Sequence, residues 1–116
     1  MNGTTIVLPL ALLLVAAVTQ LAANGVIKRN GFVGIRIPST LGGDAAWLAG
    51  HKAAVAPVWI GFAAATVIGV WDILTGDSMS FTVAAFVVFV ATLAFSVYAA
   101  SRGARAASEF DQSRTG

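Results

Sequence analysis

The chain has 116 residues, of which 58% are apolar and 10% are charged. Soluble domains carry charge on about a quarter of their residues, so this composition predicts a protein dissolved in lipid, with room for about three membrane spans and no second domain. The absence of cysteine excludes disulfides, thiolate metal sites and thiol redox switches, and membrane topology explains the net charge of +2 better than direct binding of nucleic acid.

The first predicted element is an apolar segment over residues 6–27, interrupted only by Thr19, Gln20 and Asn24. At 1.5 Å per residue it just crosses a hydrocarbon core of about 30 Å as a helix. A cleaved signal peptide is the competing interpretation, but no positive charge precedes the segment and no clean small-residue cleavage site follows it. Gln20 and Asn24 share a helix face, where they either hydrogen-bond a neighbouring helix or line a cavity.

The loop after this segment carries most of the unusual chemistry of the chain. It follows the spacing N-x3-G-x-R-x-P-x-T-L-x5-W-x3-H, which corresponds to Asn30, Gly34, Arg36, Pro38, Thr40, Leu41, Trp47 and His51. Its glycines and prolines predict a shaped turn structure, with an extended residue before Pro38. A short helix is expected from Gly43 or Asp44, with Trp47 and His51 on one face. This helix either lies in the membrane interface or runs on into the next span.

Three residues of this loop are candidates for a direct role. Arg36 can cap helix carbonyls, clamp a lipid phosphate or bind a partner carboxylate through its fork of donors. His51 is the only histidine and can act as a sensor or a base, but no second ligand stands at metal spacing, which favours a hydrogen-bonded or interfacial histidine. Thr40 is expected to cap the following helix rather than to act as a nucleophile.

The second and third spans are predicted at residues 53–71 and 81–100. Backbone groups in lipid must be satisfied within their own segment, so both spans are helices. Gly61, Ala65 and Gly69 recur every four residues along the second span and form a ridge of small residues that lets helices approach closely. We expect this ridge to pack within the chain, with contact to another subunit as the alternative.

The distribution of basic residues predicts the orientation, because all of them lie in the first loop or in the tail after residue 100. The positive-inside rule places that loop and the C-terminus in the cytoplasm and the N-terminus outside, with Asp72 and Asp77 near the outer turn. The predicted fold is an all-α integral membrane domain at residues 1–102, with three transmembrane helices and a structured cytoplasmic loop with a short interfacial helix between the first two. A polar cytoplasmic tail at 103–116, disordered past Glu109, follows.

The loop resembles the signature of the SdpI family of small bacterial membrane proteins. That signature is an Asn, then Gly-Ile-Arg-x-Pro-x-Thr-Leu, a variable stretch, Trp, and His followed by a basic residue, and the arrangement of spans extends the resemblance to about Arg102. Ser39 stands where the family commonly has an aromatic residue, and the family's namesake has additional spans before this domain. The resemblance implies a protein of the bacterial cell membrane that protects its producer from a secreted peptide toxin and can hold a transcriptional repressor at the membrane.

The leading functional hypothesis is therefore a non-enzymatic immunity or signal-sensing protein. Its expected partners are membrane lipids together with a peptide toxin, a cytoplasmic regulator or a larger membrane complex, and no cofactor or metal is expected. The alternative is an accessory subunit that packs on a larger complex through the small-residue ridge. A transporter would need an ionisable group at mid-span, and none of the predicted spans has one. An enzyme would need paired carboxylates, an activated nucleophile or a set of metal ligands, and one histidine with five acidic residues does not supply them.

Overall fold

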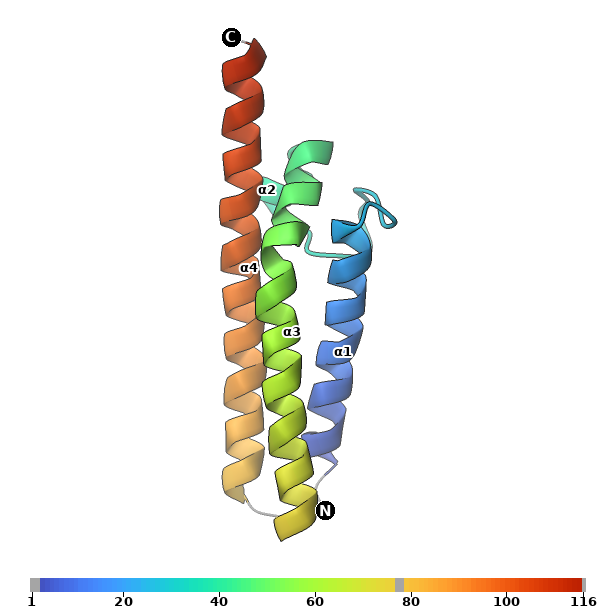
Figure 1. Cartoon of the computed structure of the whole chain (residues 1–116), viewed down its shortest axis with the longest axis vertical. Coiled ribbons are helices and arrows are strands. Elements are labelled where there is room, and N and C mark those ends of the chain that lie inside the picture. Colours follow the sequence, from blue (N-terminus) through green and yellow to red (C-terminus); the bar gives the residue numbers. More distant parts are fainter. Residues whose placement is uncertain (1–2, 77–78, 116) are drawn as a thin grey trace.

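Three long helices run side by side, and a folded loop lies at one end of the bundle (Figure 1). The computed structural model describes residues 3–76 and 79–115, and the elements in chain order are α1 (Thr4–Ala23), α2 (Pro38–Leu41), α3 (Asp44–Thr75) and α4 (Met79–Thr115). α1, α3 and α4 are each long and apolar enough to cross a membrane. Every element in the described ranges is a helix, so the predicted all-α fold with three apolar helices is confirmed.

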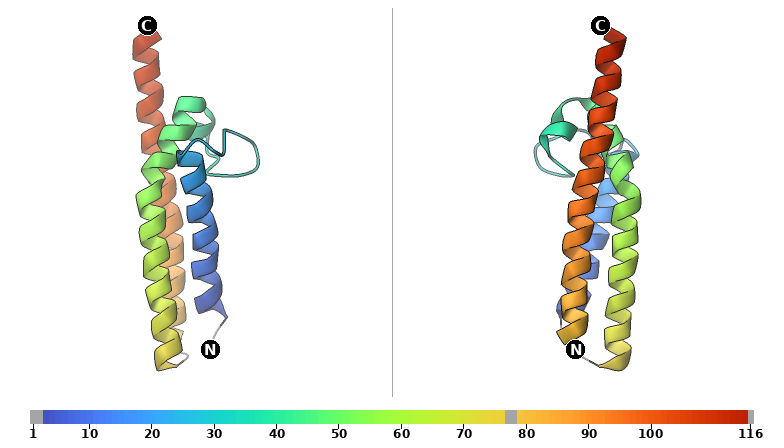
Figure 2. Two further views of the ribbon diagram at one scale, coloured as in Figure 1. Left: turned by 45° about the vertical axis from the view of Figure 1, so that its right-hand side comes forward. Right: turned by 90° about the vertical axis from the view of Figure 1, so that its left-hand side faces the viewer.

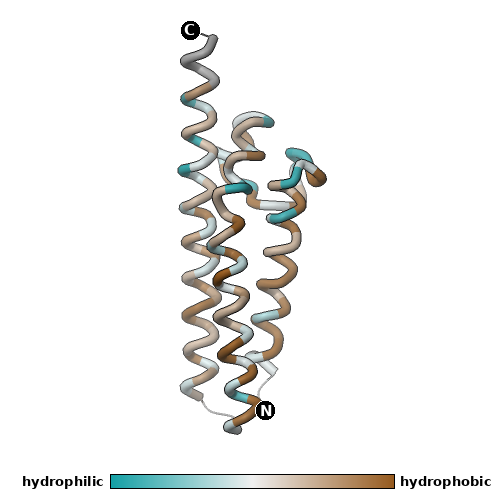
Figure 3. Tube along the Cα trace, in the orientation of Figure 1, coloured by the Kyte–Doolittle hydropathy of each residue, from teal (hydrophilic) through white to brown (hydrophobic). Residues whose placement is uncertain are grey.

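The two ends of the bundle differ in polarity. Figure 3 shows mainly apolar residues along the lower part of all three long helices, and hydrophilic residues gathered at the other end, where the chain passes from α1 to α3 and on the upper part of α4. We call this the loop end, and we call the opposite end, where α3 is followed by α4, the turn end. Asp77, which was predicted near the turn, lies outside the described residues.

α1 ends at Ala23, earlier than the predicted boundary at residue 27. The next two residues form a helix C-cap in which Gly25 has a φ of +82° and donates its N–H to the carbonyl of Ala22 at 3.1 Å. The N–H of Val26 bonds to the carbonyl of Leu21 at 2.9 Å. This pattern of reversed bonds around a left-handed glycine satisfies the last helix carbonyls and turns the chain out of the helix axis.

α3 is one continuous helix of 32 residues, and it begins at Asp44. At 1.5 Å per residue it is longer than a hydrocarbon core of about 30 Å, so its first turns extend beyond the span predicted to start at residue 53. Of the two alternatives for the helix expected from Gly43 or Asp44, the one observed is that it runs on into the second span as the beginning of α3, so it is not the separate interfacial helix of the predicted fold. The short helix of the loop, α2, lies earlier in the chain. α3 bends in its upper part (Figure 1). Pro57 lies inside this helix and removes one of its backbone hydrogen bonds.

α4 runs from Met79 to Thr115 and extends beyond the other helices at the loop end (Figure 2). The predicted disorder past Glu109 is therefore wrong. The helix continues because residues 101–115 contain no proline and many good helix formers, and because its first turns past the predicted span pack on α3. A Cβ atom placed on Gly103 would lie only 2.8 Å from the carbonyl oxygen of Ala49, so glycine permits this close approach.

The predicted ridge of small residues packs within the chain, because Gly61, Ala65 and Gly69 are all buried. A methyl group on Gly61 would overlap the side chain of Thr92 on α4. A Cβ atom on Gly69 would lie 2.6 Å from the backbone oxygen of Thr5 on α1. The ridge thus seats α3 against both neighbours, which is how close helix contact is achieved in lipid without water exclusion.

Two buried polar residues join α1 to α3 at the turn end. The hydroxyl of Thr5 donates to a carboxylate oxygen of Asp72 at 2.8 Å, and both residues are 1% exposed. At the other end of the same interface, the indole N–H of Trp59 donates to the side-chain oxygen of Gln20 at 3.1 Å, and Gln20 in turn donates to Asn24. The predicted hydrogen bond to a neighbouring helix is thus observed for Gln20, whereas Asn24 bonds Gln20 itself.

Candidate functional site

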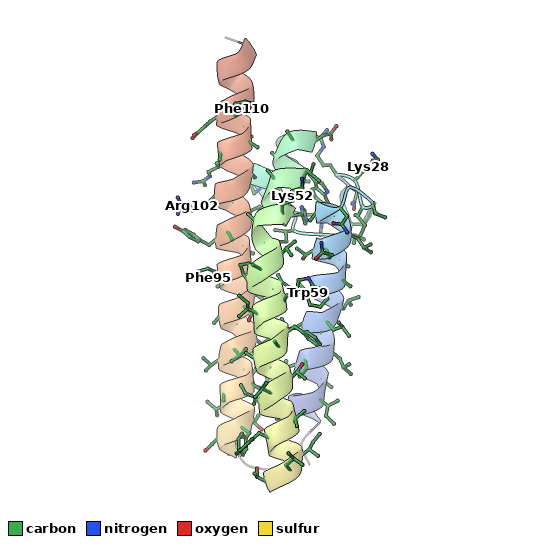
Figure 4. The ribbon with its side chains drawn as sticks, viewed as in Figure 1. Lys28, Lys52, Trp59, Phe95, Arg102 and Phe110 are labelled. Atoms are coloured by element: carbon green, nitrogen blue, oxygen red, sulfur yellow. The ribbon has the colours of Figure 1, made fainter. Side chains whose placement is uncertain are left out.

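The motif residues come together at the loop end, where the segment from residue 24 to residue 43 folds over the first turns of α3. We call this unit, which includes α2 and α3 as far as His51, the cap. Figure 4 shows that the loop side chains gather around the upper ends of α1 and α3. Two of the motif side chains on α3, Trp47 and His51, are buried at 3% and 0% exposure, and on α2 Thr40 is buried at 0%.

His51 is held by backbone groups on both ring nitrogens. Its Nε2 accepts the N–H of Ile35 at 2.9 Å, and its Nδ1 lies 2.7 Å from the carbonyl oxygen of Trp47, one turn earlier on α3. A carbonyl oxygen can only accept, so Nδ1 carries the proton and the ring is the neutral Nδ1–H tautomer. The imidazole therefore bridges the loop to α3, and both nitrogens that could bind a metal ion are occupied.

Burial sets the protonation behaviour of this histidine. His51 precedes the span predicted from the sequence at residues 53–71. Desolvation lowers the pKa of His51 from its ordinary value of 6.5, and the hydrogen bond to the Trp47 carbonyl offsets part of this effect. A protonated ring would also turn Nε2 into a donor facing the Ile35 N–H, which is a further reason why the cap requires the neutral form.

Trp47 forms the wall against which the loop packs. Its indole N–H donates to the carbonyl oxygen of Ile27 at 3.0 Å, and its ring lies 4.2 Å from the His51 ring, centroid to centroid. Gly34 passes over both rings with a φ of +105°, and a Cβ atom there would lie 2.8 Å from the Trp47 ring. Gly34 is thus required twice, for its backbone conformation and for its lack of a side chain.

Thr40 ties α2 to the extended segment before it. Its hydroxyl donates to the carbonyl oxygen of Ile35 at 2.6 Å and accepts the N–H of Ile37 at 3.1 Å. The sequence predicted that Thr40 caps the following helix, and this is wrong, because the residue before α3 is Gly43, which supplies no side-chain cap. Thr40 instead closes the first turn of its own helix, which Pro38 begins after an extended Ile37.

Asn30 organises the outer part of the loop. Its side-chain oxygen accepts the N–H groups of Phe32 and Val33 at 2.8 and 2.7 Å. Its side-chain nitrogen donates to the carbonyl oxygens of Lys28 and Val33 at 2.7 and 3.2 Å. All of this bonding is local, as in the turns that asparagine side chains commonly stabilise.

Arg36 and Leu41 are exposed members of the motif. The Arg36 guanidinium donates to the carbonyl oxygen of Gly31 and so closes the loop tip, and the residue is exposed. The carbonyl oxygen of Leu41 accepts a hydrogen bond from Arg29 at 3.2 Å, and Arg29 also lies 3.5 Å from a carboxylate oxygen of Asp44. The contact of Arg36 is thus made to the loop backbone rather than to a helix terminus.

Sequence reasoning missed the groups that the motif side chains bind and two contacts of the cap with α4. These groups are the carbonyl of Ile27 and the N–H and carbonyl of Ile35. They belong to the backbone, so the amino-acid type at these positions does not reveal them. The Ser39 hydroxyl lies 3.3 Å from that of Ser101, and a Cβ atom on Gly50 would lie 2.9 Å from the carbonyl oxygen of Ala100. A glycine at position 50, on the same helix as Trp47 and His51, is the one sequence feature that could have indicated a close contact between this helix and a neighbouring one.

The site offers structural contacts rather than a set of reactive groups. Within residues 3–76 and 79–115, no three His, Asp or Glu side chains come together as metal ligands would. The polar side chains of Asn30, Thr40 and His51 bind backbone groups of the loop and of α3. This arrangement can therefore keep the loop tip and the basic residues around it in one fixed shape at one end of the bundle.

Three apolar helices with a folded, basic loop at one end define a small multi-pass membrane protein. Residues 26–99 match the model of the SdpI/YfhL protein family, so the chain belongs to that family. The matched region contains the cap from residue 26 onward, all of α3, and α4 as far as residue 99. A search of curated proteins and a search of solved structures each gave no match.

Proposed function

We propose that this chain is a non-enzymatic immunity or signal-sensing protein of the bacterial cell membrane, which protects against a membrane-active peptide and recruits a regulator through the cap. The observation that supports this proposal most is that the buried motif side chains bind backbone groups and hold the cap in one shape. A fixed shape is what a recognition surface needs, because a preorganised loop loses little entropy when a partner binds.

The proposal includes an orientation in which the loop end and the C-terminus are cytoplasmic. The basic residues of the cap and of α4 lie at the loop end, which the positive-inside rule assigns to the cytoplasm. The turn end then faces outward and is the first part of the protein that a secreted peptide meets. Arg36 is the strongest candidate contact for a cytoplasmic partner, since the residue is exposed at the loop tip and its guanidinium has donors beyond the one bonded to Gly31.

A survival assay tests this function. The full chain is expressed in a bacterium sensitive to secreted membrane-active peptides, and killing curves are compared with those of an empty vector, Arg36→Ala and Arg105→Ala. We expect the wild-type chain and Arg105→Ala to protect, and Arg36→Ala to reach the same membrane level with reduced protection or signalling. Equal killing with and without the chain across the peptide panel, together with no effect of Arg36→Ala on reporter output, would overturn the proposal.

The second candidate, an accessory subunit, is favoured by a different surface from the one the sequence indicated. The ridge of Gly61, Ala65 and Gly69 is buried within the chain, but an apolar groove of about 440 Å³ remains between α3 and α4, with Ala64 and Ala91 among its small residues. Mass spectrometry of the tagged protein purified in mild detergent distinguishes the two functions. A membrane protein recovered in equal amounts supports the accessory subunit, and recovery without such a partner supports the first proposal.

A further inference from the structure

A cavity of about 390 Å³ opens at the loop end between the last turn of α1, the segment that follows it, and the first turns of α3. This volume lies within the range of small-molecule sites, roughly 300–1,000 Å³. The proposed function makes no use of this cavity. Its floor is apolar and its rim is charged, a combination that decides which chemical class it can bind.

The floor is fixed in place by the cap. It is made by Ala22, Ile27, Trp47 and Leu48. The Trp47 ring cannot rotate to fill the space, because its N–H is bonded to the Ile27 carbonyl and its face lies against His51. The cavity is therefore part of the folded structure and needs no rearrangement to admit a ligand.

The rim carries two cations and one carboxylate, which leaves it net positive. Lys28 makes no side-chain hydrogen bond or ion pair within the described part of the chain, and Figure 4 places it beyond the upper end of α1. The Nε of Arg29 lies 3.5 Å from the Asp44 carboxylate, and one Nη donates a hydrogen bond to the Leu41 carbonyl oxygen. The other N–H groups of its guanidinium remain able to bind a ligand. The N-terminus of α3 adds a partial positive charge at the same rim, since Gly43 supplies no side-chain cap.

We propose that this cavity binds a phosphate ester with an apolar body, and that its natural source is the headgroup of an anionic membrane lipid. Arginine and lysine together recognise phosphate oxygens through charge-assisted hydrogen bonds. The cavity begins where the apolar helix α1 ends, so a lipid phosphate at the rim leaves its first acyl carbons over the floor of Trp47 and Leu48. A soluble phosphate ester shares the headgroup chemistry, and the experiment separates the two sources.

Native mass spectrometry of the full chain in mild detergent tests the site. Phosphatidylglycerol and phosphatidylcholine are titrated separately onto the wild-type chain, onto Lys28→Gln/Arg29→Gln, and onto the matched pair Lys52→Gln/Arg105→Gln. The control pair removes one lysine and one exposed arginine outside the cavity lining. Lys28→Glu alone is the second test variant, because Lys28 has no side-chain partner whose loss would unfold the chain.

We expect one phosphatidylglycerol to bind with saturation and its affinity to fall by about tenfold or more in Lys28→Gln/Arg29→Gln and in Lys28→Glu, with the control pair unchanged. Equal weakening in both double variants would overturn the site, because it would show a general attraction between charges. Equal affinity for phosphatidylcholine would overturn the choice of an anionic headgroup.

A parallel titration with glycerol phosphate separates the two sources. Displacement of the bound lipid by glycerol phosphate supports recognition of the headgroup at this site. If glycerol phosphate binds the wild-type chain but not Lys28→Glu, and phosphatidylglycerol does not bind, then the site stands and its lipid source is overturned in favour of a soluble ligand.

Discussion

Gly34 is the loop residue whose replacement tests the cap geometry most simply. Alanine at this position would have to adopt a φ of +105° and would place Cβ 2.8 Å from the Trp47 ring. A strained backbone of this kind costs on the order of 1–3 kcal/mol, and the steric overlap adds to it. We therefore expect Gly34→Ala to lower the midpoint of thermal unfolding, measured by circular dichroism in detergent.

The neighbouring Gly31 is the matched control for this substitution. A Cβ atom there meets nothing within 4 Å, and its φ lies outside the left-handed region. Gly31→Ala should change the free energy of unfolding by no more than about 0.5 kcal/mol and so leave the unfolding midpoint close to that of wild type. If the two variants unfold at the same temperature, the described path of the loop over Trp47 is incorrect.

His51 predicts how stability depends on pH. Burial lowers the pKa of His51 in the folded chain below its ordinary value of 6.5, so the unfolded chain takes up a proton first as the pH falls. The contribution of His51 to folding is thus complete above pH 6.5, declines as the pH falls through that value, and stops changing below the folded-state pKa. Unfolding midpoints measured across this range should show the decline in wild type.

His51→Gln provides the comparison, because glutamine does not titrate and carboxylates contribute equally to both chains. The difference in stability between wild type and His51→Gln should shrink as the pH falls below 6.5. A difference that stays constant, or that grows at low pH, would mean that the folded chain accommodates the protonated ring.

At the scale of elements, the contact between α3 and α4 rests on Gly61. A methyl group there overlaps Thr92, and such overpacking typically costs about 1–3 kcal/mol. We expect Gly61→Ala to destabilise the bundle in thermal unfolding, whereas Ala63→Val, which adds volume at an exposed position of the same helix, should have little effect.

Thr92→Ala removes the two nearest atoms of the overlap. The double variant Gly61→Ala/Thr92→Ala should therefore lose less stability than the sum of the two single variants, which a double-mutant cycle measures. Strict additivity would indicate that Gly61 does not face Thr92.

Hydropathy predicted the three apolar helices, but not where they end. The end of α1 depends on the left-handed conformation of Gly25, and the continuation of α4 depends on its contact with α3 at Gly103 and Ala49. Both features arise from local geometry and packing, which leave no trace in a window of mean hydropathy. The placement of Trp47 and His51 on one helix face followed from their spacing, whereas their burial and their backbone partners depend on the path of the loop.

At the scale of the whole molecule, the orientation is open to a direct test. The chain contains no cysteine, so each introduced cysteine is a unique label. We expect Thr75→Cys, at an exposed position of the turn end, to react in intact cells with a maleimide that does not cross membranes, and Ser39→Cys at the loop end to react only after permeabilisation. The reverse pattern would place the cap outside the cell and would remove the proposed recruitment of a cytoplasmic regulator.

The central claim is that the motif side chains hold the cap in one folded shape, and hydrogen exchange of the purified protein tests it most directly. In wild type, the amide of Ile35 is bonded to the His51 ring, so peptides covering residues 31–41 should exchange slowly. His51→Phe keeps a ring of similar size but removes the acceptor, and it should accelerate exchange in that segment while the spans and the control Lys52→Gln stay unchanged. Free exchange of the loop in wild type, or no acceleration in His51→Phe, would contradict the account.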